Sequence, residues 1–101
     1  MHDILSLTKK ATDQISKILV NAPNDSDAVL VGVNNSGCNG YSYKLDFVNS
    51  KDVTNYDCIV KNDIKVYIEP KATMYLLGSI MDYKEDKLFS KFVFENPNQK
   101  S

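Results

Sequence analysis

The first hydrophobic pattern in the chain predicts an amphipathic helix. After Thr8, apolar side chains recur every three or four residues, and polar side chains fill the positions between them. The apolar positions are Ala11, Ile15, Ile18 and Leu19. Thr8 suits the N-cap because its hydroxyl can accept a hydrogen bond from a free backbone N–H of the first turn. Asn21-Ala22-Pro23 predicts the end of the helix, since proline disfavours a helical residue before it.

The next part of the chain has the pattern of two β-strands. Residues 28–33 form a short run of mostly apolar, β-branched side chains, which is typical of a buried strand. Residues 41–48 alternate, so that their large side chains share one face of a half-buried strand. These large side chains are Tyr41, Tyr43, Leu45 and Phe47. The two strands are separated by a turn-rich loop.

The second half of the sequence predicts more strands and a short helix. Strands are expected over residues 59–60, 64–68, 80–83 and 91–95. The first two form a hairpin across residues 61–63. Pro70 suits the first turn of a helix and Gly78 suits its C-terminal cap, so a helix is expected over Lys71–Leu77. Residues 1–101 are therefore expected to form one small α+β domain. It is mostly β, with twisted sheets or a small β-sandwich and the N-terminal helix packed against it.

The charge of the chain excludes two classes of partner. It has 12 basic and 13 acidic side chains, a net charge of -1, and no arginine among the basic residues. This balance leaves no basic patch for nucleic acid or for an anionic membrane, and no bidentate fork for phosphates or base edges. The apolar runs are also too short to cross a bilayer. We therefore expect no nucleic acid and no membrane among its partners.

The two cysteines, Cys38 and Cys58, indicate a reducing environment. Two are too few for a disulfide scaffold, and the N-terminal residues lack the basic and long apolar segments of a secretion signal. Reduced thiols are the expectation for such a chain. The sequence therefore predicts a cytoplasmic protein.

The segment with the clearest chemical potential is Ser36-Gly37-Cys38-Asn39-Gly40-Tyr41, between the two predicted strands. Glycines near Cys38 leave its sulfur uncrowded and allow backbone N–H groups to approach it. Such N–H dipoles lower the pKa of a thiol, and the thiolate is the form that binds iron or zinc. From the residues alone, a metal-binding or reactive Cys38 and a buried, inert Cys38 both stay open.

Several motifs resemble those of the HesB/IscA-like family of A-type iron–sulfur carriers, in the same order and at the same spacing. They are Leu7-Thr8-Lys9-Lys10-Ala11, Gly32-Val33 with Gly37-Cys38-Asn39-Gly40-Tyr41-Ser42-Tyr43, Ile80-Met81-Asp82-Tyr83, and Phe92-Val93-Phe94-Glu95-Asn96-Pro97-Asn98. The resemblance extends from the first helix to the end of the chain. It implies a HesB-like β-sandwich and a role in iron–sulfur cluster assembly, without enzymatic activity.

The resemblance also implies that Cys38 is the metal ligand and the cofactor-binding residue. Family members bind iron or an iron–sulfur cluster, [2Fe–2S] or [4Fe–4S], between the subunits of a homodimer or tetramer. They work with other assembly factors and deliver the cluster to apo-protein recipients. Their remaining ligands are two cysteines of a C-terminal Cys-Gly-Cys motif, which has no counterpart in these 101 residues. Two explanations stay open: a sequence that is a piece of a longer chain, and a natural variant without this tail.

Two other functions also stay open. A metal-free module of the same fold would pair with other iron–sulfur assembly factors. A thiol enzyme would use Cys38 as a nucleophile, although the single histidine, His2, gives no Cys–His pair. Cys58 matches no family ligand and is expected to be a small hydrophobic residue on a strand. Asp82 and Glu95 are expected to be solvated surface charges.

Overall fold

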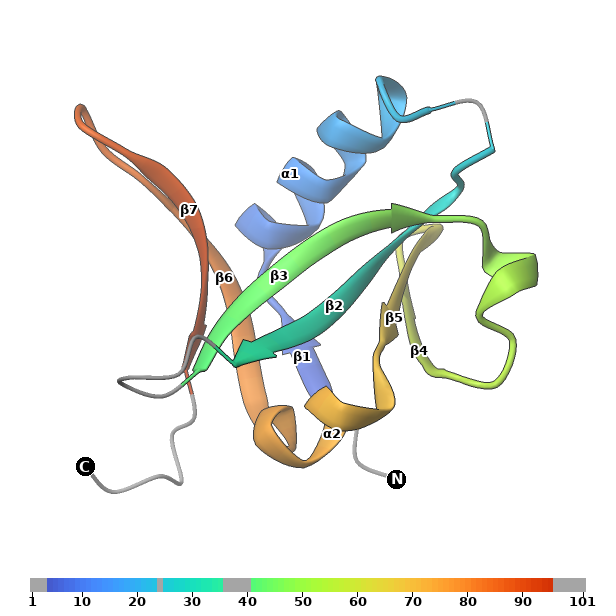
Figure 1. Cartoon of the computed structure of the whole chain (residues 1–101). Helices are drawn as coiled ribbons and strands as arrows, with labels where there is room; N and C mark the ends of the chain where they lie inside the picture. Colours follow the sequence, from blue (N-terminus) through green and yellow to red (C-terminus); the bar gives the residue numbers. More distant parts are fainter. Residues whose placement is uncertain (1–3, 24, 36–40, 96–101) are drawn as a thin grey trace.

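The computed structural model describes residues 4–23, 25–35 and 41–95, without the side chains of residues 34, 35, 41 and 42. In this part of the chain, two α-helices and seven strands follow one another as Figure 1 labels them. The elements are β1 (Leu5–Leu7), α1 (Lys9–Val20), β2 (Ala28–Asn35), β3 (Tyr41–Val48), the 3-10 turn η1 (Ser50–Asp52), β4 (Asp57–Lys61), β5 (Ile64–Ile68), α2 (Pro70–Leu76), β6 (Ser79–Glu85) and β7 (Ser90–Glu95). The predicted α+β class, with more strand than helix, is confirmed.

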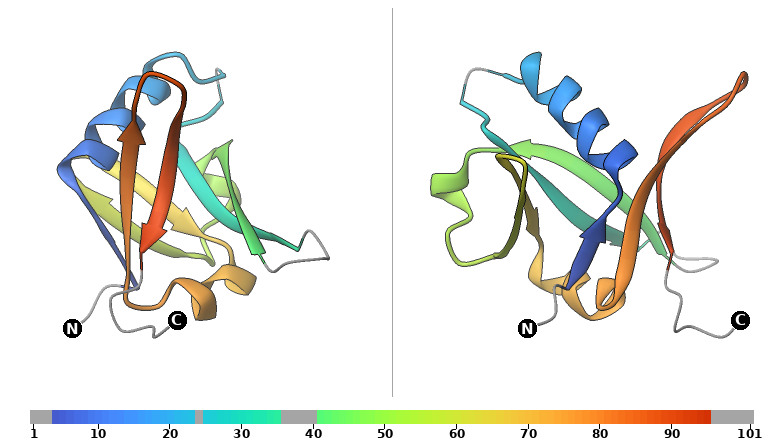
Figure 2. Two further views of the ribbon diagram at one scale, coloured as in Figure 1. Left: turned by 90° about the vertical axis from the view of Figure 1, so that its left-hand side faces the viewer. Right: turned by 180° about the vertical axis from the view of Figure 1, so that it is seen from behind.

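The strands form two mixed sheets. In the four-stranded sheet the order is β3-β2-β5-β4, in which β2 and β5 are parallel and the outer strands are antiparallel to their neighbours. In the three-stranded sheet the order is β1-β6-β7, with β1 parallel and β7 antiparallel to β6. The β6–β7 hairpin extends away from the rest of the molecule, as Figure 1 and the right-hand view of Figure 2 show.

The main core lies where α1, α2 and the two sheets meet. Helix α1 buries one face, and α2 buries Ala72 and Leu76. The buried residues of this core are Leu5, Leu7, Ala11, Ile15, Val29, Val31, Ile64, Val66, Ile68, Ala72, Leu76 and Met81. Their removal from water is the main force that holds the two sheets and the helices together.

The local signals in the sequence predict several element ends correctly. Thr8 is the N-cap of α1 and its side chain accepts a hydrogen bond from the backbone N–H of Ala11. The hairpin between β4 and β5 turns at Asn62 and Asp63, whose φ angles are 52° and 68°. Asparagine and aspartate tolerate this left-handed region, which a two-residue hairpin turn requires. Gly78 follows α2 with a φ of 80°, in agreement with its predicted place after the helix.

Two features differ from the sequence-based expectation. Strand β1 was not expected, because a run of three residues carries too little periodicity to be recognised. It forms because Leu5 and Leu7 are buried and because the strand pairs with β6 from the other end of the chain. Strands β4 and β6 are also longer than predicted. Their additional residues are mostly exposed and pair through the backbone, which gives no hydrophobic signal.

Candidate metal centre

The predicted ligand, Cys38, lies outside the described residues, but the strands on either side of its loop are well defined. Strands β2 and β3 pair in register up to the pair of Asn35 with Tyr41. The ladder therefore fixes the positions of Asn35 and Tyr41, the residues that flank the Cys38 segment in the sequence. This end of the ladder and the end of β7 lie at the same end of the molecule (Figures 1 and 2).

An aromatic contact connects this ladder to the three-stranded sheet. The rings of Tyr43 and Phe94 are 4.5 Å apart, with an interplanar angle of 44°. Within the hairpin, Tyr83 and Phe92 form a second pair with a centroid distance of 5.0 Å. Tyr43 is 38% exposed, so the rim of this aromatic cluster reaches the surface. The strand that leads out of the Cys38 loop is therefore held to β7, the strand that leads to the C-terminal residues.

Gly32 allows two long polar side chains to lie close to β2. A Cβ atom at this position would lie 2.9 Å from Glu69 Oε2 and 2.9 Å from Lys44 Cε. Real Cβ atoms do not approach other atoms this closely. Any other residue at position 32 would therefore occupy space that the Glu69 and Lys44 side chains now use. The backbone N–H of Glu69 also donates to the carbonyl of Val31 at 2.9 Å, which joins the start of α2 to β2.

Asp82 is half-buried and has a structural partner, which the expectation of a solvated surface charge did not include. Its Oδ1 accepts hydrogen bonds from the hydroxyl of Thr8 at 2.7 Å and from the backbone N–H of Tyr83 at 2.8 Å. The bond from Thr8 is the main cause that lowers the pKa of Asp82 below its usual range. Glu95, in contrast, is exposed as expected, 3.8 Å from the ammonium of Lys84.

Cys58 lies on strand β4, as expected, but it is exposed and not a buried hydrophobic residue. It pairs across the ladder with Tyr67, which is buried. Burial raises the pKa of the Tyr67 hydroxyl, and the neighbouring Cys58 raises it further. Strand β4 is at the opposite edge of the sheet from β3. The sheet therefore keeps Cys58 apart from the strand that leads out of the Cys38 loop.

Among the described residues, no group of three or more His, Cys, Asp or Glu side chains could hold a metal ion. Nor is any helix in this part of the chain long and apolar enough to cross a membrane.

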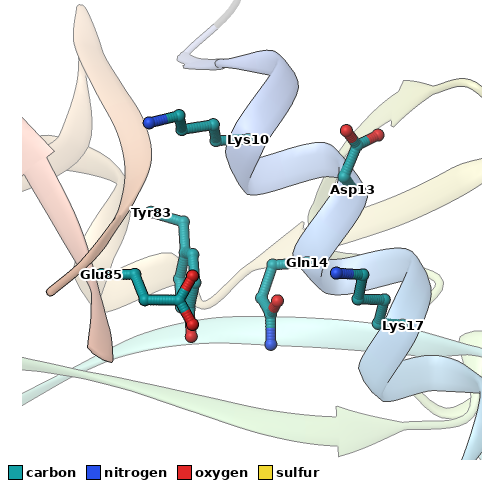
Figure 3. Close-up of a pocket in the computed structure, with 6 residues that line it drawn as sticks. All are labelled: Lys10, Asp13, Gln14, Lys17, Tyr83 and Glu85. Atoms are coloured by element: carbon teal, nitrogen blue, oxygen red, sulfur yellow. The ribbon is translucent and has the colours of Figure 1, made fainter. Parts of the chain in front are cut away.

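A polar pocket of about 240 Å³ lies between α1 and the β6–β7 hairpin (Figure 3). It is lined by Lys10, Asp13, Gln14, Lys17, Tyr83 and Glu85. The sequence contains a signal for this pocket, since the four lining residues on the helix share one face. None of the residues that line the pocket has a thiol.

Comparison with known proteins defines the class of this chain. Residues 4–101 match the family described as iron-sulphur cluster biosynthesis, and the chain therefore belongs to that family. It is similar to the curated protein named iron-sulfur cluster assembly 1 homolog, mitochondrial, of Gallus gallus. The two are 46% identical over 96 residues, which cover 95% of this chain and 73% of the relative. The human protein of the same name is 44% identical over the same share of each chain.

Solved structures show the same fold. The chain is similar to Escherichia coli SufA, described as involved in the biosynthesis of iron-sulfur clusters, with a TM-score of 0.78 and 27% identity. That match covers 95% of this chain and 82% of SufA. It is also similar in fold to an IscA crystallised with a [2Fe-2S] cluster. Here the TM-score is 0.70 and the identity 24%, over 93% of this chain and 83% of the other.

These findings confirm the resemblance inferred from the motifs and a function in iron–sulfur cluster assembly. They overturn the expected cytoplasmic location, because these curated relatives are named as mitochondrial proteins. The prediction depended on the cysteines being reduced, and composition alone cannot distinguish the cytoplasm from another reducing compartment.

Proposed function

We propose that this protein is an iron–sulfur carrier in which Cys38 binds iron or a cluster at a subunit interface and from which the cargo passes to apo-proteins. The observation that carries the proposal is the β2–β3 ladder. It fixes Asn35 and Tyr41, which flank the segment with Gly37-Cys38-Asn39-Gly40, in a chain that belongs to the iron–sulfur cluster biosynthesis family. Cys38 is the one cysteine of this sequence that matches a ligand position of the family motif.

The ligand requirement of a cluster supports binding between subunits. An iron–sulfur cluster takes four protein ligands, usually thiolates. Cys58 lies on β4, at the opposite edge of the sheet from the strand that follows the Cys38 segment. Cys38 is therefore the thiolate that we expect each chain to contribute to the cluster. Two copies provide two such thiolates around one [2Fe–2S] or [4Fe–4S] cluster, or around iron. Binding between subunits suits a carrier that acts with assembly factors and recipient apo-proteins and not as an enzyme.

Anaerobic reconstitution with ferrous iron and sulfide tests Cys38 directly. We expect the parent protein and Cys58→Ser to develop thiolate-to-iron charge-transfer absorption in the visible range. Cys38→Ser should not develop it. Cys58→Ser is the matched control because it removes an exposed thiol elsewhere on the same sheet. Equal absorption in Cys38→Ser and the parent would overturn the role of Cys38. Absorption in none of the three would favour the metal-free interaction module.

A further inference from the structure

Strand β7 lies at the edge of the three-stranded sheet. It is the outer strand of its sheet and pairs with β6 alone among the described strands. The hairpin turn, in which Asp86 N donates to Phe89 O at 2.8 Å, fixes the alternation of hydrogen bonds along the ladder. Phe92 and Phe94 occupy the positions that do not bond to β6, so their N–H and C=O groups point away from it. An edge of this kind can accept another strand.

We propose that the β7 edge pairs with the β7 edge of a second copy of this chain, antiparallel and centred on Val93. The sequence Lys91-Phe92-Val93-Phe94-Glu95 complements itself in this register. Lys91 lies opposite Glu95 of the partner subunit, and Phe92 lies opposite the partner's Phe94. Opposite charges and aromatic pairs directly across a ladder both stabilise it. The two sheets then form one six-stranded sheet with a two-fold axis at Val93.

Charge complementarity selects this register. The next antiparallel registers that keep the outward N–H and C=O groups opposite one another are centred on Phe92 or on Phe94. In the first, Lys91 lies opposite Val93 of the partner subunit. In the second, Glu95 lies opposite the partner's Val93. Both registers leave the charges unpaired, so only the register centred on Val93 pairs Lys91 with a carboxylate.

The charged side chains of β4, another outer strand, already form hydrogen bonds within the chain. The ammonium of Lys61 donates to the carbonyl of Leu7 at 2.6 Å, and Asp57 accepts a hydrogen bond from Thr73 at 3.4 Å. Pairing β4 with a second copy through these residues would have to replace both bonds. This strand is therefore less suited to a symmetric interface than β7.

Strand β3 is also constrained, whereas the charges of β7 are exposed. The Lys44 side chain lies over Gly32, next to Glu69, and so is held against its own sheet. On β7, Glu95 is near Lys84 at 3.8 Å, and these side chains are 60% and 55% exposed. Lys91 lies 5.3 Å from the centre of the Phe89 ring. Exposed contacts of this kind contribute little to stability and are easily exchanged.

The proposed interface involves strands next to the Cys38 segment, and its consequence for a shared cargo rests on the proposed function. Tyr43, on the strand that follows the Cys38 loop, packs against Phe94, one residue from the two-fold axis. Phe92 of the partner subunit would lie beside Phe94 and extend the aromatic row. The β3 strands that follow the two Cys38 segments in the sequence would then both contact the paired β7 strands.

A cysteine at the axis tests the pairing without metal. The pair of Val93 with the partner's Val93 is of the non-hydrogen-bonded type, in which the Cα atoms lie about 4.5 Å apart. This separation permits a disulfide. In a Cys38→Ser/Cys58→Ser background, we expect Val93→Cys to form covalent dimers at least about tenfold faster than Leu45→Cys or Ile59→Cys under mild oxidation. The controls are half-buried residues at the centres of the competing edge strands. Equal or faster cross-linking of either control would overturn the proposal.

A charge exchange tests the register. Lys91→Glu and Glu95→Lys each place like charges opposite one another, and we expect each to weaken dimerisation about tenfold in sedimentation experiments. The double variant restores the pairing and should dimerise like the parent. Lys87→Glu at the exposed hairpin tip makes the same charge change as Lys91→Glu outside the interface. Single variants that dimerise like the parent would contradict the register. Both tests run without iron, so their outcome is independent of whether Cys38 binds it.

Discussion

Thr8 and Asp82 are 74 positions apart in the sequence, yet the hydroxyl of Thr8 donates to Asp82 Oδ1 at 2.7 Å. The same hydroxyl oxygen accepts from the backbone N–H of Ala11 at 3.1 Å. One side chain thus caps α1 and joins it to β6. The backbone N–H of Thr8 also donates to the carbonyl of Met81 at 3.0 Å. Two short motifs from opposite ends of the sequence therefore form a single structural link.

We predict that Thr8→Ala destabilises the protein by about 1–2 kcal/mol, near the upper end for loss of an N-cap, because it also removes the bond to Asp82. Urea unfolding at neutral pH measures this loss. Thr8→Ser keeps the hydroxyl and is the matched control, with a much smaller expected effect. A Thr8→Ala protein as stable as Thr8→Ser would show that the link contributes nothing to stability.

The lowered pKa of Asp82 predicts an acid-dependent loss of stability. A carboxyl whose pKa is lower in the folded than in the unfolded state stabilises the fold fully above the unfolded pKa. This contribution is lost as the pH falls through the lower folded pKa, so it disappears at pH values below the ordinary 3.8. In Asp82→Asn this part of the pH dependence should be missing. Unfolding curves from pH 7 to acid, for this variant and the parent, provide the measurement.

The acid dependence does not vanish entirely in Asp82→Asn. Hydrogen bonds from the Ser50 hydroxyl and backbone N–H also lower the pKa of Asp27, which therefore contributes with the same sign in both proteins. The two proteins should differ at neutral pH and converge as the pH falls. Parallel curves over the whole range would contradict the role of Asp82.

We expect the Tyr43–Phe94 contact to couple the two sheets energetically. Aromatic pairs in this distance range contribute about 0.5–1.5 kcal/mol beyond the area that they bury. A double-mutant cycle with Tyr43→Leu and Phe94→Leu measures the coupling free energy. Tyr43 with Phe92 is the control pair and should show weaker coupling, because the ring of Phe92 pairs with Tyr83. Coupling of zero for Tyr43 and Phe94 would mean that the ring contact does not hold the ladder to β7.

Helix α2 should depend on one buried leucine. Leu76 is fully buried in the main core, so Leu76→Ala should cost about 2–5 kcal/mol in the free energy of unfolding. Leu88, at the tip of the β6–β7 hairpin, is 92% exposed. Leu88→Ala should therefore change stability by less than about 0.5 kcal/mol. Similar losses in the two variants would contradict the core described for this fold.

The sequence predicts those structural features that depend only on residues close to one another in the chain. The cap at Thr8 and the turn at Asn62 and Asp63 are local choices of backbone conformation, and both are found where the pattern indicates. Strand β1 and the partner of Asp82 depend instead on residues more than 70 positions away. No local periodicity records such contacts, so they were not predicted. The exposure of Cys58 follows from the position of β4 at a sheet edge, which a single strand pattern cannot indicate.

The candidate site was predicted in a different way. Glycines around Cys38 indicate an accessible thiol, but they do not distinguish a metal ligand from an inert residue. The iron–sulfur prediction came from the order of four motifs, and the family match over residues 4–101 confirms the family. That Cys38 is the ligand stays a prediction. The pocket beside Tyr83 was missed, because it needs α1 and β6 to be placed next to each other.

The most direct test of the carrier function is transfer of the cargo. Protein reconstituted with iron and sulfide is mixed anaerobically with an apo-protein recipient in the presence of an iron chelator, and circular dichroism follows the cluster in the recipient. We predict transfer from the parent and from Cys58→Ser, and none above the chelator-limited background from Cys38→Ser. Transfer from Cys38→Ser at the rate of the parent would contradict the account.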